Sequence, residues 1–336
     1  MALTQGDPAG VGPEIIVKLL ESQPPSEEWR PLLFAEKVAL DSVPSAVAGP
    51  LSERLVYLPS IPERSAIEAL PVEAVAVVDP VAESRSLDPG RSGPADAGGA
   101  MAALDAGIEA VQGGCADALV TAPVSKASIA RHHRPEFRGH TEYLAKAAGL
   151  ERYGRDYLMA FLTPDLQVAL LTTHLPLRQA LDEIREEALV EALLLLNRAA
   201  GGRMVVAGVN PHAGEGGLMG TEEIEIVQPA VERARELGVV VSGPDSADSL
   251  FARARQGEYD WVLSLYHDQG LIAVKTSAFG LSTNWTLGLP FLRTSVDHGT
   301  AFDIAGRGDA DPSSLIQVVQ TTLDLISGNL PRGTQA

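Results

Sequence analysis

Short runs of hydrophobic residues alternate along this chain with longer segments in which hydrophobic residues recur at helical spacing. The runs have the length of buried strands, and they cover Val75–Val78, Ala118–Thr121, Val168–Thr172, Arg203–Val209 and Trp261–Leu265. The segments with helical spacing cover Ala97–Val111, Leu177–Ala199 and Glu222–Leu237. Strands that alternate with helices predict an α/β protein with a mainly parallel sheet.

Local signals add detail at several points. Pro13 suits the first position of a helix, and hydrophobic residues follow it at helical spacing. Gly238 is a stop signal for the helix predicted before it. The apolar run Leu271–Val274 is predicted as a further strand, which puts Lys275 at a strand end. The segment Pro44–Glu83 is richer in Pro and Ser and is predicted to be less regular.

Three histidines stand just past the ends of predicted strands. His174 follows the run that ends at Thr172, His212 follows the run that ends at Val209, and His267 follows the run that ends at Leu265. In a parallel sheet the carboxyl ends of the strands line one crevice. Three imidazoles there can ligate a divalent metal and leave a position open for substrate.

The same histidines can also be read as ordinary hydrogen-bonded loop residues, since their spacing matches no short metal motif. Asp268 and Glu215 stand beside two of them and could orient a ring or move a proton. On the pattern alone both interpretations stay open.

A few basic and polar residues are candidates for binding an anion. Lys275, Asn284 and Arg293 lie within nineteen residues of one another. Arginine offers a bidentate fork to a phosphate and lysine a point charge, although solvated surface cations would give the same pattern. Lys126 is a further basic residue after a strand. His140 opens a helical segment, where Thr141 could serve as the N-cap.

Composition narrows the function classes. The chain has 336 residues, about two domain lengths, and a formal net charge of −18, which argues against nucleic acid and anionic membranes as partners. Cys115 is the only cysteine, so a disulfide framework and a cysteine-rich metal site are excluded. No targeting segment or membrane span is apparent, and we expect a cytoplasmic protein.

Eight motifs in family order resemble the 4-hydroxythreonine-4-phosphate dehydrogenase (PdxA) family. They are Gly6-Asp-Pro-Ala-Gly-Val-Gly-Pro-Glu, Thr121-Ala-Pro-Val-Ser-Lys, Gly139-His-Thr-Glu-Tyr-Leu-Ala, Thr173-His-Leu-Pro-Leu, Asn210-Pro-His-Ala-Gly-Glu-Gly-Gly, Gly243-Pro-Asp-Ser-Ala-Asp-Ser-Leu-Phe, Tyr266-His-Asp-Gln-Gly and Arg293-Thr-Ser-Val-Asp-His-Gly-Thr-Ala. They extend from residue 6 to about residue 301, so the resemblance covers nearly the whole chain.

The resemblance implies a fold and a reaction. The fold is two α/β/α subdomains like those of isocitrate and isopropylmalate dehydrogenases, with the active site in the cleft between them. We expect the first subdomain at 1–138 plus about 300–336 and the second at 139–299. The reaction is oxidation of 4-phosphooxy-L-threonine by NAD or NADP, followed by decarboxylation to 3-amino-2-oxopropyl phosphate on the route to pyridoxal phosphate.

The resemblance also assigns residues. It implies one divalent metal (Zn, Mg or Co) held by His174, His212 and His267 in a site shared across a homodimer. The substrate contacts it implies are His140, Thr141, Lys275, Asn284 and Arg293, and the acid/base candidates are Asp248 and Asp268, with His140 as a further catalytic candidate. It identifies no cofactor-binding residue.

Three alternatives stay open. Sister branches of the family oxidise 4-phospho-threonate, 4-phospho-erythronate or other hydroxy acids, and retention of Lys275 and Arg293 favours a phosphorylated substrate. A zinc hydrolase would use the three histidines with Glu215 as base and would need no nicotinamide. A non-enzymatic binding module would use the same residues for ligand affinity alone.

Overall fold

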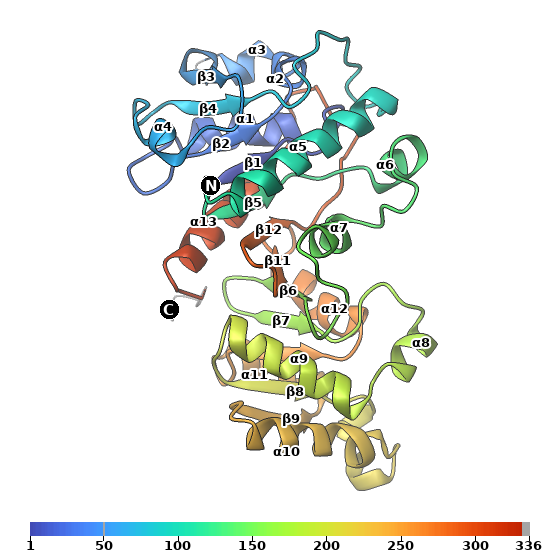
Figure 1. The fold of residues 1–336 in the computed structure, drawn as a ribbon. Coiled ribbons are helices and arrows are strands. Elements are labelled where there is room, and N and C mark those ends of the chain that lie inside the picture. The colour runs from blue at the N-terminus through green and yellow to red at the C-terminus, as the bar shows by residue number, and fades with distance from the viewer. Residues whose placement is uncertain (50, 331–336) are drawn as a thin grey trace. The chain divides into compact units, whose positions relative to one another are not determined.

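The computed structural model describes residues 1–49 and 51–330 and divides them into two compact units (Figure 1). Unit 1 comprises Met1–Ala148 and Pro290–Asn329, and unit 2 comprises Gly149–Leu289 together with Leu330. The unit boundaries fall at residues 148 and 290, about ten residues from the expected 138 and 300. His140, Thr141 and Arg293 therefore belong to unit 1, whereas the expected boundaries put them in the second subdomain.

Unit 1 contains a parallel sheet with the strand order β3-β4-β2-β1-β5-β12. The strands are β1 (Ala2–Thr4), β2 (Leu32–Phe34), β3 (Leu55–Leu58), β4 (Val75–Val78), β5 (Ala118–Thr121) and β12 (Leu292–Val296). The helices are α1 (Gly12–Ser22), α2 (Lys37–Asp41), α3 (Ser45–Ala48), η1 (Leu51–Arg54), α4 (Arg64–Glu68), α5 (Pro94–Gln112), α6 (Lys126–His132), α7 (His140–Ala147) and α13 (Ser313–Ile326).

Helices cover both faces of this sheet, and β1, β2, β4 and β5 are buried along their whole length. Leu3 of β1 packs in one hydrophobic core with Ile15 of α1 and Leu315 of α13. The next residue, Thr4, points to the opposite face, where α5 passes so closely that a methyl group on Gly107 would lie 2.7 Å from the Thr4 Cγ2 atom. The period-2 alternation of the strand thus gives each face its own helix layer.

Unit 2 contains a mixed sheet with the strand order β11-β6-β7-β10-β8-β9. The β11–β6 and β6–β7 pairs are antiparallel and the others are parallel. The strands are β6 (Leu158–Leu162), β7 (Gln167–Leu170), β8 (Met204–Ala207), β9 (Val241–Asp245), β10 (Trp261–Ser264) and β11 (Thr283–Leu287). The helices are α8 (Leu177–Asp182), α9 (Glu186–Ala199), η2 (Pro211–Gly217), η3 (Glu223–Val227), α10 (Gln228–Glu236), α11 (Ala247–Arg255) and α12 (His267–Ser277).

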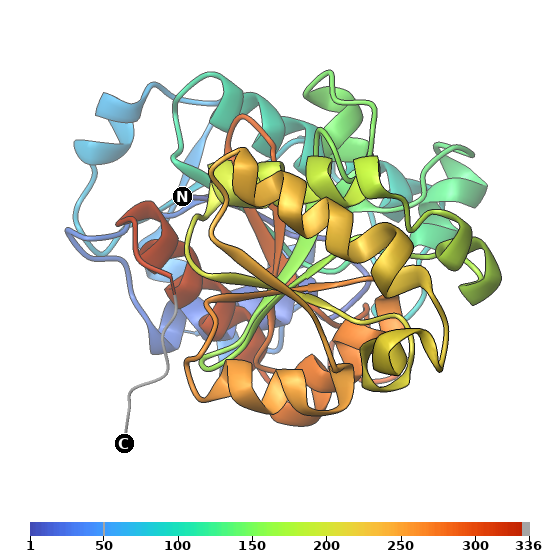
Figure 2. The same ribbon diagram turned by 90° about the horizontal axis from the view of Figure 1, so that it is seen from below.

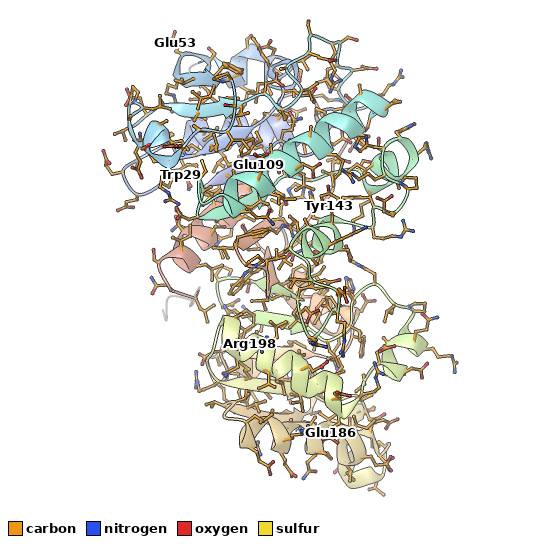
Figure 3. All side chains as sticks on the ribbon, viewed as in Figure 1. Trp29, Glu53, Glu109, Tyr143, Glu186 and Arg198 are labelled. Atoms are coloured by element: carbon orange, nitrogen blue, oxygen red, sulfur yellow. The ribbon has the colours of Figure 1, made fainter. Side chains whose placement is uncertain are left out.

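The helices of unit 2 also lie on both faces of its sheet. Helices α11 and α12 pack on one face through Leu250 and Leu271, against Val168 and Val262. Helices α9 and α10 lie on the other side of the sheet (Figure 2). Glu186 stands in the first turn of α9 and Arg198 in its last turn (Figure 3), an arrangement that suits the helix dipole.

The α/β class predicted from the sequence is confirmed, and β4 and β5 coincide with predicted strands. One helix prediction is wrong, because Leu177–Ala199 is two helices, α8 and α9, instead of one. The helix predicted at Glu222–Leu237 is present, and its first part is the π-helical turn η3, which leads directly into α10. The segment Pro44–Glu83, predicted to be less regular, carries only the short elements α3, η1, β3, α4 and β4.

The run Leu271–Val274 is helical, so the prediction that Lys275 follows a strand is also wrong. It lies inside α12, and Lys275 stands in the last turn of that helix. Leu271 and Val274 are buried while Ile272 between them is 67% exposed, which is a helical period of burial. Four apolar residues in a row are too few to distinguish a strand from a helix by periodicity.

None of the helices within residues 1–49 and 51–330 is both long and apolar enough to cross a bilayer.

Candidate functional site

The three histidines predicted as metal ligands follow three neighbouring parallel strands of unit 2. His174 follows β7, His267 follows β10 and His212 follows β8, and β10 pairs with both of the other strands. The rings of His174 and His267 lie close together, with their centroids 5.4 Å apart. Adjacent strand ends thus bring these residues to the same edge of the sheet, where α/β proteins commonly bind ligands.

Side-chain hydrogen bonds tie these strand ends to one another. Thr172 Oγ1, after β7, donates to the carbonyl of Leu265, after β10, at 2.8 Å. The Gln269 side chain accepts from Leu265 N and donates to the carbonyl of Gly208, after β8, with both bonds 2.8 Å long. The main chain leading into each histidine is therefore held laterally by a neighbouring strand end.

Carboxylates engage two of the three imidazoles. Asp268 Oδ1 lies 2.7 Å from Nδ1 of His267, and Glu215 Oε2 lies 3.2 Å from Nδ1 of His212. A carboxylate on Nδ1 fixes the tautomer and leaves Nε2 to ligate a metal, which is the usual arrangement around a histidine-bound metal. The donor chemistry therefore fits a divalent cation, although the described residues hold no preassembled group of three His, Cys, Asp or Glu ligands.

Asp248, an acid/base candidate, lies in the first turn of α11 in the same unit. The Ser246 hydroxyl donates to its carboxylate at 2.8 Å. This hydrogen bond lowers the pKa of Asp248 below its ordinary value, and the nearby His212 adds to the shift. The carboxyl is consequently ionised at neutral pH and suited to accept a proton rather than to donate one.

The two remaining candidates of unit 2 lie on different elements. Lys275 is exposed on α12, and Asn284 lies in β11. The Asn284 Oδ1 atom is buried and has no hydrogen-bond partner among the residues that the structure describes. A buried amide oxygen without a partner is unfavourable unless a ligand supplies the donor.

The candidates of unit 1 form a second group. Arg293 of β12 is only 1% exposed, and its Nη2 atom donates to Thr121 Oγ1 at 2.7 Å. Burial lowers the pKa of Arg293 to about 9. Thr141 is buried in the first turn of α7, but the N-cap position of that helix is Gly139, so the prediction that Thr141 could be the N-cap is wrong.

His140 is the first residue of α7, and its imidazole is electrically neutral at neutral pH. Burial is the main cause that lowers its pKa well below the ordinary value, and the positive charges of Arg293 and Lys126 lower it further. Its Nε2 atom is buried and lacks a hydrogen-bond partner within the described part of the chain. A neutral ring beside two cations is suited to bind a polar or anionic group.

Sequence reasoning missed the residues that support the site. Thr172, Gln269 and Glu223 make hydrogen bonds around the strand ends; Gln269 lies in the motif Tyr266-His-Asp-Gln-Gly but received no role there, and Thr172 and Glu223 lie in none of the eight motifs. The sequence marked Lys126 only as a further basic residue among the anion-binding candidates. In the structure its ammonium lies next to the start of α7. A methyl group placed on Gly139 would be 3.4 Å from the Lys126 Nζ atom.

Comparison with known proteins shows which family this chain resembles. The family model described as pyridoxal phosphate biosynthetic protein PdxA matches residues 30–322. The chain is 40% identical over 335 residues to the 4-hydroxythreonine-4-phosphate dehydrogenase of Aromatoleum aromaticum, covering 97% of this chain and 96% of that protein. It is 42% identical over 322 residues to the Xylella fastidiosa protein of the same name, covering 94% and 92%.

Solved structures agree with this similarity. The 4-hydroxythreonine-4-phosphate dehydrogenase from Klebsiella pneumoniae superimposes with a TM-score of 0.83 at 34% identity, over 97% of each chain. A terephthalate 1,2-cis-dihydrodiol dehydrogenase from Burkholderia xenovorans LB400 gives a TM-score of 0.62 at 27% identity, also over 97% of each chain. Because the family model spans residues 30–322 and relatives are 40% and 42% identical over nearly the whole chain, this chain belongs to the PdxA family.

Proposed function

We propose that this chain is a 4-hydroxythreonine-4-phosphate dehydrogenase. It oxidises the secondary alcohol of 4-phosphooxy-L-threonine, and the resulting β-keto acid loses carbon dioxide to give 3-amino-2-oxopropyl phosphate. The observation that carries this proposal is the identity of 40% and 42% to two proteins of that name over nearly the full length of both partners. The relative that acts on a dihydrodiol is less similar, at 27% identity.

The reaction needs a hydride acceptor, which we propose to be NAD or NADP. We also propose a divalent metal, Zn, Mg or Co, held by His174, His212 and His267. When bound, such an ion supplies positive charge that stabilises the negative charge developing on the substrate oxygen. Support for the ligand set comes from the three neighbouring strand ends and from the carboxylates that engage Nδ1 of two of the rings.

The substrate is an anion, and we propose that His140, Thr141, Lys275, Asn284 and Arg293 bind it. A guanidinium fork suits a phosphate or carboxylate. The buried His140 Nε2 and Asn284 Oδ1 atoms, which have no hydrogen-bond partner among the described residues, can form hydrogen bonds with further polar groups of the substrate. Positioning of this kind aligns the reacting C–H bond with the nicotinamide. Local positive charge at these residues matters more for recognition than the net charge of −18 on the whole chain.

Proton transfers accompany both steps. The alcohol proton must leave as the hydride departs, and the carbon that loses carbon dioxide must gain a proton. We propose Asp248, Asp268 and His140 as the residues that move these protons. The ionised carboxylate of Asp248 and the neutral ring of His140 are both in a state to accept one.

We further propose that the protein is a cytoplasmic homodimer whose metal site is shared between subunits. Mixed dimers test the sharing. Combining inactive His174→Ala and His267→Ala subunits should restore part of the activity if one site draws ligands from both chains. Verified heterodimers that remain inactive would show that each subunit carries its own complete site.

A substrate panel tests the reaction. The purified full chain with a divalent metal should reduce NAD or NADP, followed at 340 nm, when 4-phosphooxy-L-threonine is added. Reduction only with 4-phospho-erythronate or 4-phospho-threonate would assign the chain to a sister branch. Consumption of a substrate without any nicotinamide would support a hydrolase and reject the proposal.

A further inference from the structure

The loop that carries His212 has an unusual backbone. Six consecutive residues, from His212 to Gly217, have positive φ angles of 51°, 50°, 78°, 45°, 66° and 95°. Three of them, His212, Ala213 and Glu215, are not glycine, and L-residues with a side chain are strained in this left-handed region. A left-handed turn of this kind persists only where its surroundings hold it in place.

The Glu223 carboxylate provides that support. Glu223 is only 2% exposed, and its Oε1 atom accepts from the backbone N–H groups of Val209 and Asn210 at 2.7 Å each. Its Oε2 atom accepts from Asn210 Nδ2 at 2.9 Å. These are the residues that join the end of β8 to the left-handed turn, so one carboxylate fixes the direction in which the turn begins.

The same carboxylate also packs against the middle of the turn. A methyl group placed on Gly214 would lie 2.7 Å from Glu223 Oε2, closer than ordinary contact. Glu223 therefore limits the turn at its entry by hydrogen bonds and at its centre by close packing. His212 lies between these two points.

We infer that Glu223 is a positioning residue that sets the His212 imidazole for metal binding. The inference rests on the proposed function, in which His212 is a metal ligand. Glu223 itself makes its contacts to the loop backbone and to Asn210, so it acts through the backbone of the His212 loop. Groups behind the first ligands typically change metal affinity by roughly 10- to 100-fold when they are replaced.

A glutamine at position 223 has the same shape but cannot make the same bonds. If its oxygen accepts from the two backbone N–H groups, its amide NH₂ faces the NH₂ of Asn210, and two donors meet. If it is turned over, its NH₂ faces both backbone donors instead. Turning the Asn210 amide would set its oxygen against Glu222, whose Oε2 now accepts from Asn210 Nδ2 at 2.6 Å.

The test is a titration of the metal-free full chain with Co²⁺, followed by its visible absorption. The wild type should give a ligand-field spectrum that His212→Ala abolishes. We expect Glu223→Gln to bind Co²⁺ roughly 10- to 100-fold more weakly, with an altered spectrum. Asn210→Ala removes one of the three donors and should show a smaller loss.

The matched control is Glu14→Gln. Glu14 is also 2% exposed and also accepts from two backbone N–H groups, those of Gly308 and Ala310, but it lies in unit 1. We expect this variant to lose thermal stability and to keep the wild-type Co²⁺ affinity and spectrum. A general loss of stability is thereby separated from a loss of His212 positioning.

The outcomes are distinct. Wild-type affinity and spectrum in Glu223→Gln would overturn the inference, and so would equal losses of affinity in Glu223→Gln and Glu14→Gln. If Glu223→Gln does not fold, unchanged Co²⁺ binding by Asn210→Ala overturns it instead. Failure of the wild type to bind Co²⁺, or full binding by His212→Ala, would reject the metal site in the proposed function and the inference with it.

Discussion

Two glycines in the His212 loop provide a matched test of how the loop is held. Gly214 and Gly216 both have positive φ angles, of 78° and 66°. A methyl group on Gly214 would lie 2.7 Å from the Glu223 carboxylate and 3.1 Å from the carbonyl of Gly220, whereas one on Gly216 would meet nothing within 4 Å among the described residues. The substitutions Gly214→Ala and Gly216→Ala thus share the backbone cost and differ in the collision.

The size of the difference follows from these contacts. A left-handed alanine costs about 1–2 kcal/mol in either variant. At position 214 the carboxylate must also move back, and loss of one hydrogen bond to a charged group costs about 1.5–3 kcal/mol more. Gly214→Ala should therefore be less stable than Gly216→Ala by about 2 kcal/mol, or roughly 4–8 °C in melting temperature.

Differential scanning calorimetry on the two variants measures this difference, and Co²⁺ titration measures its effect on the loop. Gly216→Ala should keep more of the wild-type Co²⁺ affinity than Gly214→Ala. Equal melting temperatures and equal affinities would refute the reasoning, because the collision with Glu223 would then have no consequence.

Neighbouring glycines of α5 give a second contrast, since a methyl group on Gly99 would overlap the Glu36 carboxylate while one on Gly98 meets nothing within 4 Å among the described residues. Urea unfolding should show Gly98→Ala stabilised by about 0.5–1 kcal/mol and Gly99→Ala destabilised by about 1–3 kcal/mol, and the same sign for both would contradict the packing. Burial lowers the pKa of the His140 ring in the folded protein, so as the pH falls, His140 is protonated in the unfolded chain before it is protonated in the folded one. The free energy of unfolding therefore decreases as the pH falls below about 6.5. His140→Gln should therefore lose less unfolding free energy than the wild type between pH 7.5 and pH 5.5, and parallel losses would disprove this. Thr172→Val removes the hydrogen bond to the neighbouring strand end and should lower the free energy of unfolding by about 1 kcal/mol, whereas an unchanged urea midpoint would show that this bond contributes nothing.

The sequence predicted the α/β class because strand and helix periods are local properties of the chain. It was wrong about Leu271–Val274, where packing against the sheet decides between strand and helix. Gly270 shows the reason: a methyl group there would lie 2.8 Å from side-chain atoms of Leu170 and Ser264, so α12 lies directly on the sheet. A run of four residues carries no information about such a contact.

The sequence also could not predict which charged and polar side chains are buried. The residue pattern left open whether Arg293 binds an anion or is a solvated surface cation, and the structure places it 1% exposed in β12. Its lowered pKa and that of His140 follow from desolvation, which depends on everything packed around them. A pattern of residue types says which side chains can bind an anion, but not which of them are dehydrated.

The sequence by itself determined which residues can carry the chemistry, since the eight motifs and the histidines after apolar runs are features of short segments. Tertiary structure alone decided that β10 lies between β7 and β8 in the sheet, although β9 is the strand that precedes it in the chain. It also decided that Glu223 reaches back to Val209 and Asn210 and holds the turn of His212. The physical reason is that strand order and buried hydrogen bonds depend on contacts between distant segments, whereas residue type and periodicity are written along the chain.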